Sequence, residues 1–253
     1  MQWTVILALN WSGMTDLLST LIIPEEVRSY LAVLGLLLCW KLHAYAMEVR
    51  RRRAFTSRLY ICLSENDPET CTRCRMAHLC VYSGRMPREV GLRIRCSNRL
   101  GCRCALIPIS RQWPVAKRLR RQVKRGKSGA HQLSDQDLHA LLDGGESLSN
   151  HDRLAQTVLR AMLAEETNPE AAIQTYRQTI AQAPEASLAL QQAAAYMRLA
   201  RILERSGDFQ DALQVTRACV KAFSEKERYL LLPKPQYNGM LARQSRLVRQ
   251  FLR

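Results

Sequence analysis

The chain has 253 residues, and its hydrophobic fraction of 47% is that of an ordinary globular core, but its formal net charge is +16. The first 127 residues hold 23 of the 38 basic side chains and 8 of the 22 acidic ones, so the rest of the chain is nearly neutral. This step in composition predicts a boundary near residue 127. The N-terminal half is therefore strongly basic, and we expect it to have an anionic partner such as lipid headgroups or nucleic-acid phosphate.

The first apolar stretch covers residues 3–23. It lacks the positively charged start of a signal peptide, so we expect no cleavage. It suits either an interfacial helix or the first arm of a helical hairpin that turns at residues 24–26.

The second apolar stretch, YLAVLGLLLCWKLHAY (residues 30–45), is predicted to be a membrane helix, with a buried soluble helix as the alternative. Lys41 and His43 lie close enough to its end to reach headgroups. Four arginines follow at residues 50–53, and positive charge beside a span stays on the cytosolic side. Residues 1–53 are therefore expected to form a membrane anchor, single-pass or hairpin, with residues 50–253 in the cytosol.

Residues 54–110 form a cysteine-rich segment, for which we expect a small α/β module. In a reducing cytosol, close thiols bind metal or do redox chemistry more often than they form stable disulfides. The cysteines of this segment are Cys62, Cys71, Cys74, Cys80, Cys96, Cys102 and Cys104.

Zinc is the metal that this segment favours. The C-x2-C pair Cys71 and Cys74 offers two thiolates from one turn, and Cys102 with Cys104 offers a second pair. The alternate ligands are Cys80, Cys96 and His78, and nearby arginines (residues 73, 75, 99 and 103) would lower the thiol pKa values. Unligated packing cysteines, or a redox or disulfide pair formed by Cys71 and Cys74, remain the alternatives.

Short alternating apolar runs at residues 79–82 and 90–94 flank Gly84 and Pro87. This pattern predicts a small β-hairpin between the two cysteine pairs.

Residues 111–132 form a basic tether with no acidic residue between positions 111 and 129. Val115, Leu119 and Val123 recur every four residues, which would give a helix a narrow apolar stripe inside a basic surround. We expect a group of its side chains to bind an anionic surface: Arg118, Arg120, Arg121, Lys124 and Arg125. The alternative is a solvated linker with no binding function. Among possible partners, lipid is favoured over nucleic acid or protein.

Residues 133–232 carry helix signals. Ser134 with Asp137 resembles a capping box, Asn150 and Asn168 suit helix N-caps, and Asp208 follows the break at Ser206 and Gly207. The signals predict helices ending near residues 143, 166, 184, 205 and 223.

Two helical hairpins in sequence are typical of a repeat array, and here the chain resembles the tetratricopeptide repeat family. The best copy covers residues 196–223, where a group of residues falls on the motif's signature positions: Leu199, Ala200, Gly207, Phe209 and Ala212. A weaker copy covers about residues 153–184, where Ala172, Tyr176 and Pro184 match. The resemblance implies a concave surface that binds peptides or assembles complexes. A generic helical bundle is the alternative.

In the last segment, residues 233–253, Pro233 and Pro235 are expected to interrupt helicity. An amphipathic helix is predicted from residue 239 onward, docked on the repeats or on a partner.

The sequence contains no Gly-rich phosphate loop, no G-x-S-x-G and no H-E-x-x-H, so an enzyme is not predicted. The predicted fold is mainly α, and the predicted function is a membrane-anchored cytosolic adaptor that binds protein through its repeats. A zinc-dependent nucleic-acid binder and a thiol redox protein are the other two hypotheses.

Overall fold

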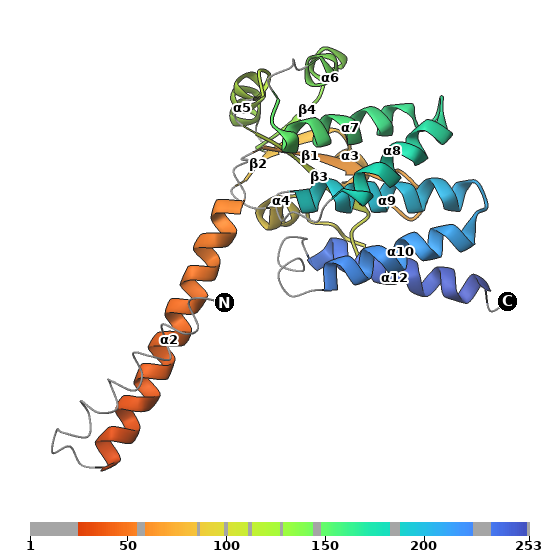
Figure 1. Cartoon of the computed structure of the whole chain (residues 1–253). Coiled ribbons are helices and arrows are strands. Elements are labelled where there is room, and N and C mark those ends of the chain that lie inside the picture. Colours follow the sequence, from red (N-terminus) through yellow and green to blue (C-terminus); the bar gives the residue numbers. More distant parts are fainter. Residues whose placement is uncertain are drawn as a thin grey trace. The chain divides into compact units, whose positions relative to one another are not determined.

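The computed structural model describes residues 25–54, 59–84, 87–98, 101–110, 113–126, 129–143, 148–182, 188–224 and 234–251. The chain divides into two compact units, residues 1–51 and 52–253, and each is described by itself. The described residues are mainly helical with one four-stranded antiparallel sheet (Figure 1). This confirms the coarse part of the predicted fold class.

Helix α2 (Glu25–Ala54) dominates the first unit and has 30 residues, a length of about 45 Å. Its apolar side chains are largely exposed, for instance Leu34 at 57% and Trp40 at 66%. Among the described helices, none combines the length and apolar character needed to cross a bilayer, which leaves the predicted membrane helix without support. The earlier apolar stretch, residues 3–23, lies outside the described residues.

The sheet contains β1 (Leu59–Ser64), β2 (Cys80–Ser83), β3 (Cys104–Ile109) and β4 (Ala130–Gln132), in the order β3-β1-β2-β4. Every neighbouring pair is antiparallel. Pro108 lies opposite Tyr60 on β3, and a proline is tolerated there because β3 is an edge strand.

Both faces of β1 and β3 are buried, and the two faces pack against different cores of the second unit. Since side chains alternate along a strand, Leu59, Ile61 and Leu63 share one face and Tyr60 and Cys62 the other. The aliphatic face joins the core that the C-terminal helices form, and the other face joins a smaller core rich in cysteine. The sheet therefore joins the cysteine-rich segment to the helical half.

Two short helices, α3 (Thr72–Met76) and α4 (Pro87–Ile94), contribute buried side chains to the core on the cysteine face. The predicted hairpin is half wrong, because residues 80–83 form β2 but residues 87–94 form a helix. Pro87 suits a first helical turn, and Val90 and Ile94 are one turn apart and both buried, which is helical spacing.

The segment predicted as a basic tether provides α5 (Ala116–Arg125) and β4. Val115, Leu119 and Val123 are all buried, so the predicted apolar stripe exists and packs inside the protein. Helix α6 (Asp135–Leu142) follows, and the predicted capping box between Ser134 and Asp137 is present.

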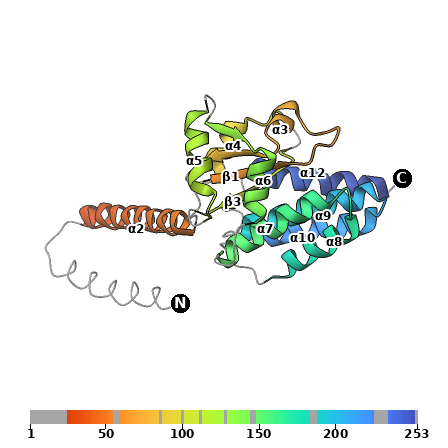
Figure 2. The ribbon, with the colours of Figure 1, turned by 90° about the horizontal axis from the view of Figure 1, so that it is seen from above.

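The helical half consists of α7 (Asn150–Ala164), α8 (Pro169–Ala181), α9 (Ala189–Arg205) and α10 (Phe209–Ser224), each packed on the next. Asn168 caps α8 as predicted, whereas Ser149 rather than Asn150 caps α7. Helix α9 packs against both α8 and α10, and most of its side chains are buried. Helices α7 to α10 lie together in both views (Figures 1 and 2). It also contacts β3, as α7 does.

The last helix, α12 (Lys234–Phe251), packs against α10. The predicted interruption at Pro235 is wrong, because a proline in the first turn of a helix removes no intrahelical hydrogen bond. Met240, Arg243 and Leu247 are buried at spacings of three and four residues, which shows that the predicted amphipathic helix docks on the chain itself.

Candidate metal centre and the ion pairs beside it

The C-x2-C pair lies at the start of α3. Cys71 is the N-cap residue of this helix, and its carbonyl oxygen accepts a hydrogen bond from the Arg75 backbone N–H at 3.0 Å. One helical turn then brings the Cys74 side chain to the same end of α3. The preceding turn is fixed by Thr70, whose hydroxyl donates to Asp67 Oδ1 at 2.6 Å.

Two further cysteines meet this pair from the segment between α4 and β3. The Sγ atoms of Cys71 and Cys96 are 3.7 Å apart, and those of Cys74 and Cys102 are 3.8 Å apart. A zinc–sulfur bond of about 2.3 Å gives a tetrahedron whose sulfur–sulfur edge is about 3.8 Å. Two edges of this four-sulfur group therefore have the length that one zinc ion requires.

The structure brings the sequence-predicted ligands together in a different combination. Among the described residues, two groups of three have ligand atoms within 4.8 Å of one another: Cys71 with Cys74 and Cys96, and Cys74 with Cys102 and Cys104. Cys96, expected as an alternate, lies beside Cys71.

The other two alternates make separate contacts. Cys80 Sγ donates to Gln132 Oε1 at 2.8 Å, and burial raises the pKa of this thiol. His78 Nδ1 accepts from the Ser64 backbone N–H at 3.1 Å, and burial lowers the pKa of His78.

Hydrogen bonds among the central thiols lower the pKa of some of them and raise that of others. Hydrogen bonds from Cys102 and Cys104 lower the pKa of Cys74 to about 2. Hydrogen bonds with Cys104 and Cys74 raise the pKa of Cys102 well above its ordinary value. Hydrogen bonding by Cys102, together with the Asn98 backbone N–H, lowers the pKa of Cys96 to about 7 in spite of its burial. Thiolates are the form of cysteine that binds metal.

The nearby arginines are engaged elsewhere. Arg73 and Arg75 are exposed, and they donate to the backbone carbonyls of Arg95 and of Asp67 and Pro68. Arg99 lies outside the described residues.

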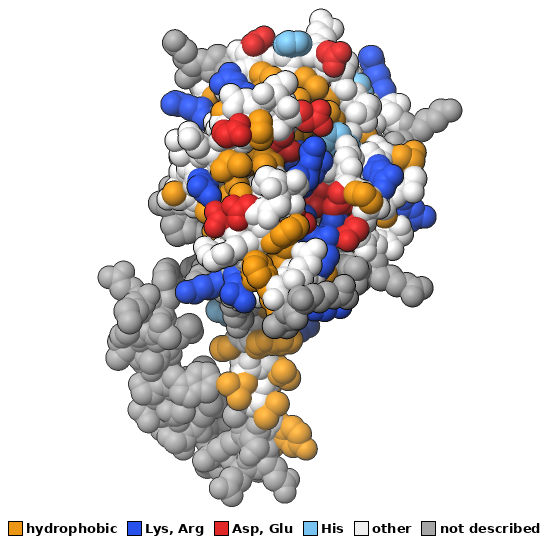
Figure 3. All heavy atoms as spheres, turned by 90° about the vertical axis from the view of Figure 1, so that its right-hand side faces the viewer, with side chains coloured by type: hydrophobic (Ala, Val, Ile, Leu, Met, Phe, Trp, Pro, Cys, Tyr) orange, Lys and Arg blue, Asp and Glu red, His pale blue; other side chains and the backbone are white. Residues whose placement is uncertain are grey.

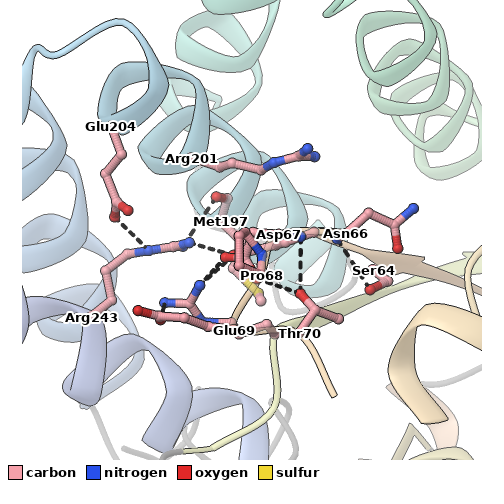
Figure 4. Close-up of polar contacts among 12 residues, drawn as sticks. Ser64, Asn66, Asp67, Pro68, Glu69, Thr70, Met197, Arg201, Glu204 and Arg243 are labelled. Atoms are coloured by element: carbon pink, nitrogen blue, oxygen red, sulfur yellow. Dashed lines mark hydrogen bonds and ion pairs between the residues drawn. The ribbon is translucent and has the colours of Figure 1, made fainter. Parts of the chain in front are cut away.

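Arg103 begins a network of ion pairs, buried on its helical side, that the sequence did not predict. It pairs with Asp67 and, at 2.5 Å, with Glu69, both in the loop between β1 and α3. From the helical side, Arg243 of α12 pairs with Glu65. Arg243 also pairs with Glu204 of α9 at 2.8 Å, as Figure 4 shows. The loop between β1 and α3 is thus held by charges that belong to the C-terminal helices.

A second set of contacts joins the end of β1 to α9. Arg198 donates to the Ser64 carbonyl oxygen at 2.9 Å and pairs with Glu165, which also accepts from the Tyr176 hydroxyl at 2.8 Å. A signal did exist in the sequence, because Arg198 has Ala194, Ala195 and Ile202 one turn away, and an arginine among such neighbours is buried only when it is paired.

A cavity of about 630 Å³ lies beside this network, between the 66–69 loop and the ends of α9 and α12. Its lining carries both signs of charge, including Asp67, Glu204, Arg201 and Arg246. Acidic and basic side chains also lie next to one another across the face drawn in Figure 3.

The predicted anionic-surface residues all lie on α5. Arg118 pairs with Asp137 at 2.8 Å, whereas Arg121, Lys124 and Arg125 are exposed and have no ion pair with any described residue. Arg120 is half-buried.

No protein-family model, no curated protein and no solved structure matches this chain.

Proposed function

We propose that the protein is a zinc-stabilised adaptor, in which a tetrathiolate site fixes a cysteine-rich module onto a tetratricopeptide-like helical array that binds a protein partner. The observation that carries the proposal is the pair of sulfur–sulfur distances, 3.7 and 3.8 Å, among Cys71, Cys74, Cys96 and Cys102. Four thiolates with no open position are typical of structural zinc rather than catalytic zinc.

The proposed zinc site supports the module mechanically. The metal would connect α3, which carries Cys71 and Cys74, with the segment between α4 and β3, which carries Cys96 and Cys102. Its ligand Cys102 is also tied to the helical half, because the Cys102 backbone N–H donates to the Pro235 carbonyl oxygen at 2.6 Å. Metal binding therefore stabilises the contact between the module and α12.

The partner surface is assigned to the outer helices. A tetratricopeptide array would bind peptides on the face formed by α7 and α9, but β3 packs against both of these helices. Helices α8 and α10 keep exposed faces, with Ala171 and Ala218 among their exposed residues. They are joined there by the exposed ion pair of Arg177 with Asp211 at 2.9 Å.

Attachment to a membrane, with residues 50–253 on the cytosolic side, belongs to the same proposal. It is supported by the apolar side chains that α2 exposes, by the four arginines at residues 50–53, and by the basic face of α5. Lipid is favoured over nucleic acid because Trp113, the one aromatic residue of the basic segment, is 1% exposed and cannot stack on a base.

The metal is tested on the full-length protein, purified in detergent under reducing conditions without chelator. We expect bound zinc, and we expect Cys96→Ser to lose zinc from the four-sulfur site. Protein that takes up no zinc when zinc is supplied would refute the proposal.

The adaptor role is tested by capture of partners from detergent-solubilised membranes. The double variant Ala171→Arg and Ala218→Arg should keep its zinc and lose the captured proteins, because it alters only exposed positions. Equal capture by parent and variant would remove α8 and α10 as the binding surface.

Attachment is tested by flotation of the full-length protein with phosphatidylcholine vesicles, with and without phosphatidylglycerol. Flotation should be stronger with the anionic lipid and should fall when Arg121, Lys124 and Arg125 are changed to Gln. Protein that stays at the bottom of the gradient with both lipids would refute the attachment.

A further inference from the structure

The cavity of about 630 Å³ beside the 66–69 loop is lined by acidic side chains that are mostly neutralised already. Three of its four acidic residues form ion pairs with arginines of the network described above: Asp67, Glu69 and Glu204. The fourth, Glu166, is exposed and forms no ion pair within the described part of the chain.

The arginines of the same lining are less well neutralised. Arg246 is held by two of these carboxylates, at 3.0 and 2.6 Å. Arg201 reaches one carboxylate, that of Glu165, at 3.6 Å, which is too long for a hydrogen bond. Arg205 is exposed and forms no ion pair with any described residue. Two cations of the lining are therefore left without a carboxylate of their own.

The charge of Arg201 is poorly compensated although its side chain is only 14% exposed. Glu165 already accepts from Arg198 Nε at 2.6 Å and from the Tyr176 hydroxyl, so little of its charge remains for Arg201. Burial and the charge of Arg198 lower the pKa of Arg201. Burial acts on Arg198 too, but Glu165 outweighs it and raises the pKa of Arg198.

One donor of Arg201 is also unused. Its Nε atom is buried and has no hydrogen-bond partner among the described residues. Figure 4 draws the Arg201 side chain without a contact to any other residue shown. A buried donor without an acceptor costs stability, so an acceptor supplied by a ligand would be bound favourably.

Arg201 and Arg205 are placed to act on the same ligand. They are one turn apart on α9 and both line the cavity, so their guanidinium groups are neighbours on one side of the helix. Like charges at this spacing repel each other, and an anion between them removes the repulsion. The planar fork of a guanidinium group matches the oxygens of a phosphate or a carboxylate.

We infer that this cavity binds a small soluble phosphomonoester, whose phosphate group is held by Arg201 and Arg205. Two uncompensated cations match the charge of a phosphomonoester, about −1.5 to −2 at pH 7, better than the single charge of a carboxylate. The volume of about 630 Å³ lies within the range of about 300–1,000 Å³ that is typical of small-molecule sites. The inference does not depend on the zinc site or on the partner surface.

The rest of the lining suits the organic part of such a ligand. Phe209, at the start of α10, lines the cavity and is 39% exposed, so its ring offers a face to a planar or apolar group. The carboxylate of Glu166 accepts hydrogen bonds from hydroxyl groups. A nucleoside monophosphate combines a phosphate, hydroxyl groups and a planar ring, and it is therefore the probe that we choose.

Calorimetric titration of the full-length protein in detergent with adenosine 5′-monophosphate tests the inference. We expect binding that weakens as salt is added. Adenosine, which lacks the phosphate, should bind at least about tenfold more weakly. Failure of the monophosphate to bind, or equal binding of adenosine, would overturn the inference.

Variants test which arginines hold the phosphate. Arg205→Gln changes an exposed position, so the protein should fold as before and bind the monophosphate at least about tenfold more weakly. Arg201→Gln should weaken binding similarly without lowering Tm, because it removes a poorly compensated cation. The control has Arg121, Lys124 and Arg125 of α5 changed to Gln. It removes more positive charge outside the cavity and should bind as the parent does.

The outcomes separate a specific site from general attraction to a basic protein. Equal weakening in the α5 variant and in Arg205→Gln would overturn the site, and so would unchanged binding by Arg205→Gln. A lipid headgroup is the other source of a phosphomonoester, and flotation with vesicles that contain phosphatidic acid tests it. Flotation that depends on Arg205, without binding of the monophosphate, would refute the soluble ligand.

Discussion

Arg243 of α12 and Glu65, the residue after β1, form an ion pair that is almost completely buried, although 178 residues separate them in the chain. Glu65 also lies 3.7 Å from Arg103, and Arg243 also pairs with Glu204. The pair is the innermost link of the charge network between the sheet and the C-terminal helices.

Arg243→Met should destabilise the protein strongly, because it leaves Glu65 buried with its main cation removed. The expected loss is about 3–5 kcal/mol in the free energy of unfolding, measured by urea denaturation. The double variant Arg243→Met with Glu65→Gln should recover part of this loss, since no charge is then left unpaired.

The matched control for this change is Arg177→Met, which removes one partner of the exposed pair with Asp211. Its expected effect is below about 1 kcal/mol. If both arginine variants cost the same, burial would not determine the strength of these pairs.

Gly101 is expected to accept no side chain. Its φ is +109°, and a Cβ there would stand 2.2 Å from the backbone nitrogen of Gly239 in α12. Gly101→Ala therefore combines backbone strain with a backbone clash, and we expect a loss of about 3 kcal/mol or more together with loosening of α12.

Gly207 provides the comparison, because its φ is +82° but a Cβ there would meet no atom within 4 Å. Gly207→Ala should cost only the strain of the conformation, about 1 kcal/mol. Thermal unfolding of both variants checks the order, and equal Tm values would contradict the clash at Gly101.

Removal of the metal should loosen specific segments. After a strong chelator, amide hydrogen exchange is expected to rise in α3, in α4 and in the first turn of α12, which Cys102 holds through Pro235. Helix α8 makes no such contact and serves as the internal control. A uniform rise across all helices would mean that the metal holds the whole fold and not these segments.

Asp152 should make stability depend on pH. Burial alone would raise the pKa of this carboxyl group, but hydrogen bonds from His151, Ser110 and Ser149 outweigh burial and lower it. The ionised group therefore stabilises the fold above the unfolded pKa of about 3.9, and this contribution is lost as the pH falls through the lower pKa of the folded state.

Asp152→Asn should consequently cost about 1–3 kcal/mol at pH 7 and progressively less below about pH 4, measured as the difference in unfolding free energy from the parent at each pH. Asp135→Asn, at an exposed position, is the control. A difference for Asp152→Asn that stays constant from pH 7 to pH 3 would contradict the stabilising role of the charge.

Local signals predicted local structure well. The capping box at Ser134 and the Asn168–Pro169 start identified two helices because a cap is formed by residues three apart in the sequence. The alternating run at residues 90–94 misled because a stretch of four or five residues fits strand and helix equally, and burial of Val90 and Ile94 together decides for the helix.

The candidate site was predicted only in part, because its ligands come from separate elements. The C-x2-C spacing identified Cys71 and Cys74, since one turn of chain determines their distance. Which distant cysteine meets them depends on how α4 and β3 pack, and this placed Cys96 beside Cys71. The partner of Glu65 could not be predicted at all, because nothing in the local sequence connects it with Arg243.

The separation of Glu65 from Arg243 also has a consequence during synthesis. The ribosome makes β1 and the cysteine-rich segment first, and residues 111–233 must follow before α12 emerges with Arg243, the buried cation that pairs with Glu65. Until then Arg103, 3.7 Å away, is the one cation among the described residues that the early part of the chain supplies to Glu65, and α10 lacks the helix that packs on it, a state that invites wrong association. Folding of this unit can finish only after α12 has been made, so a chain that stops before residue 243 lacks the cation that pairs with Glu65.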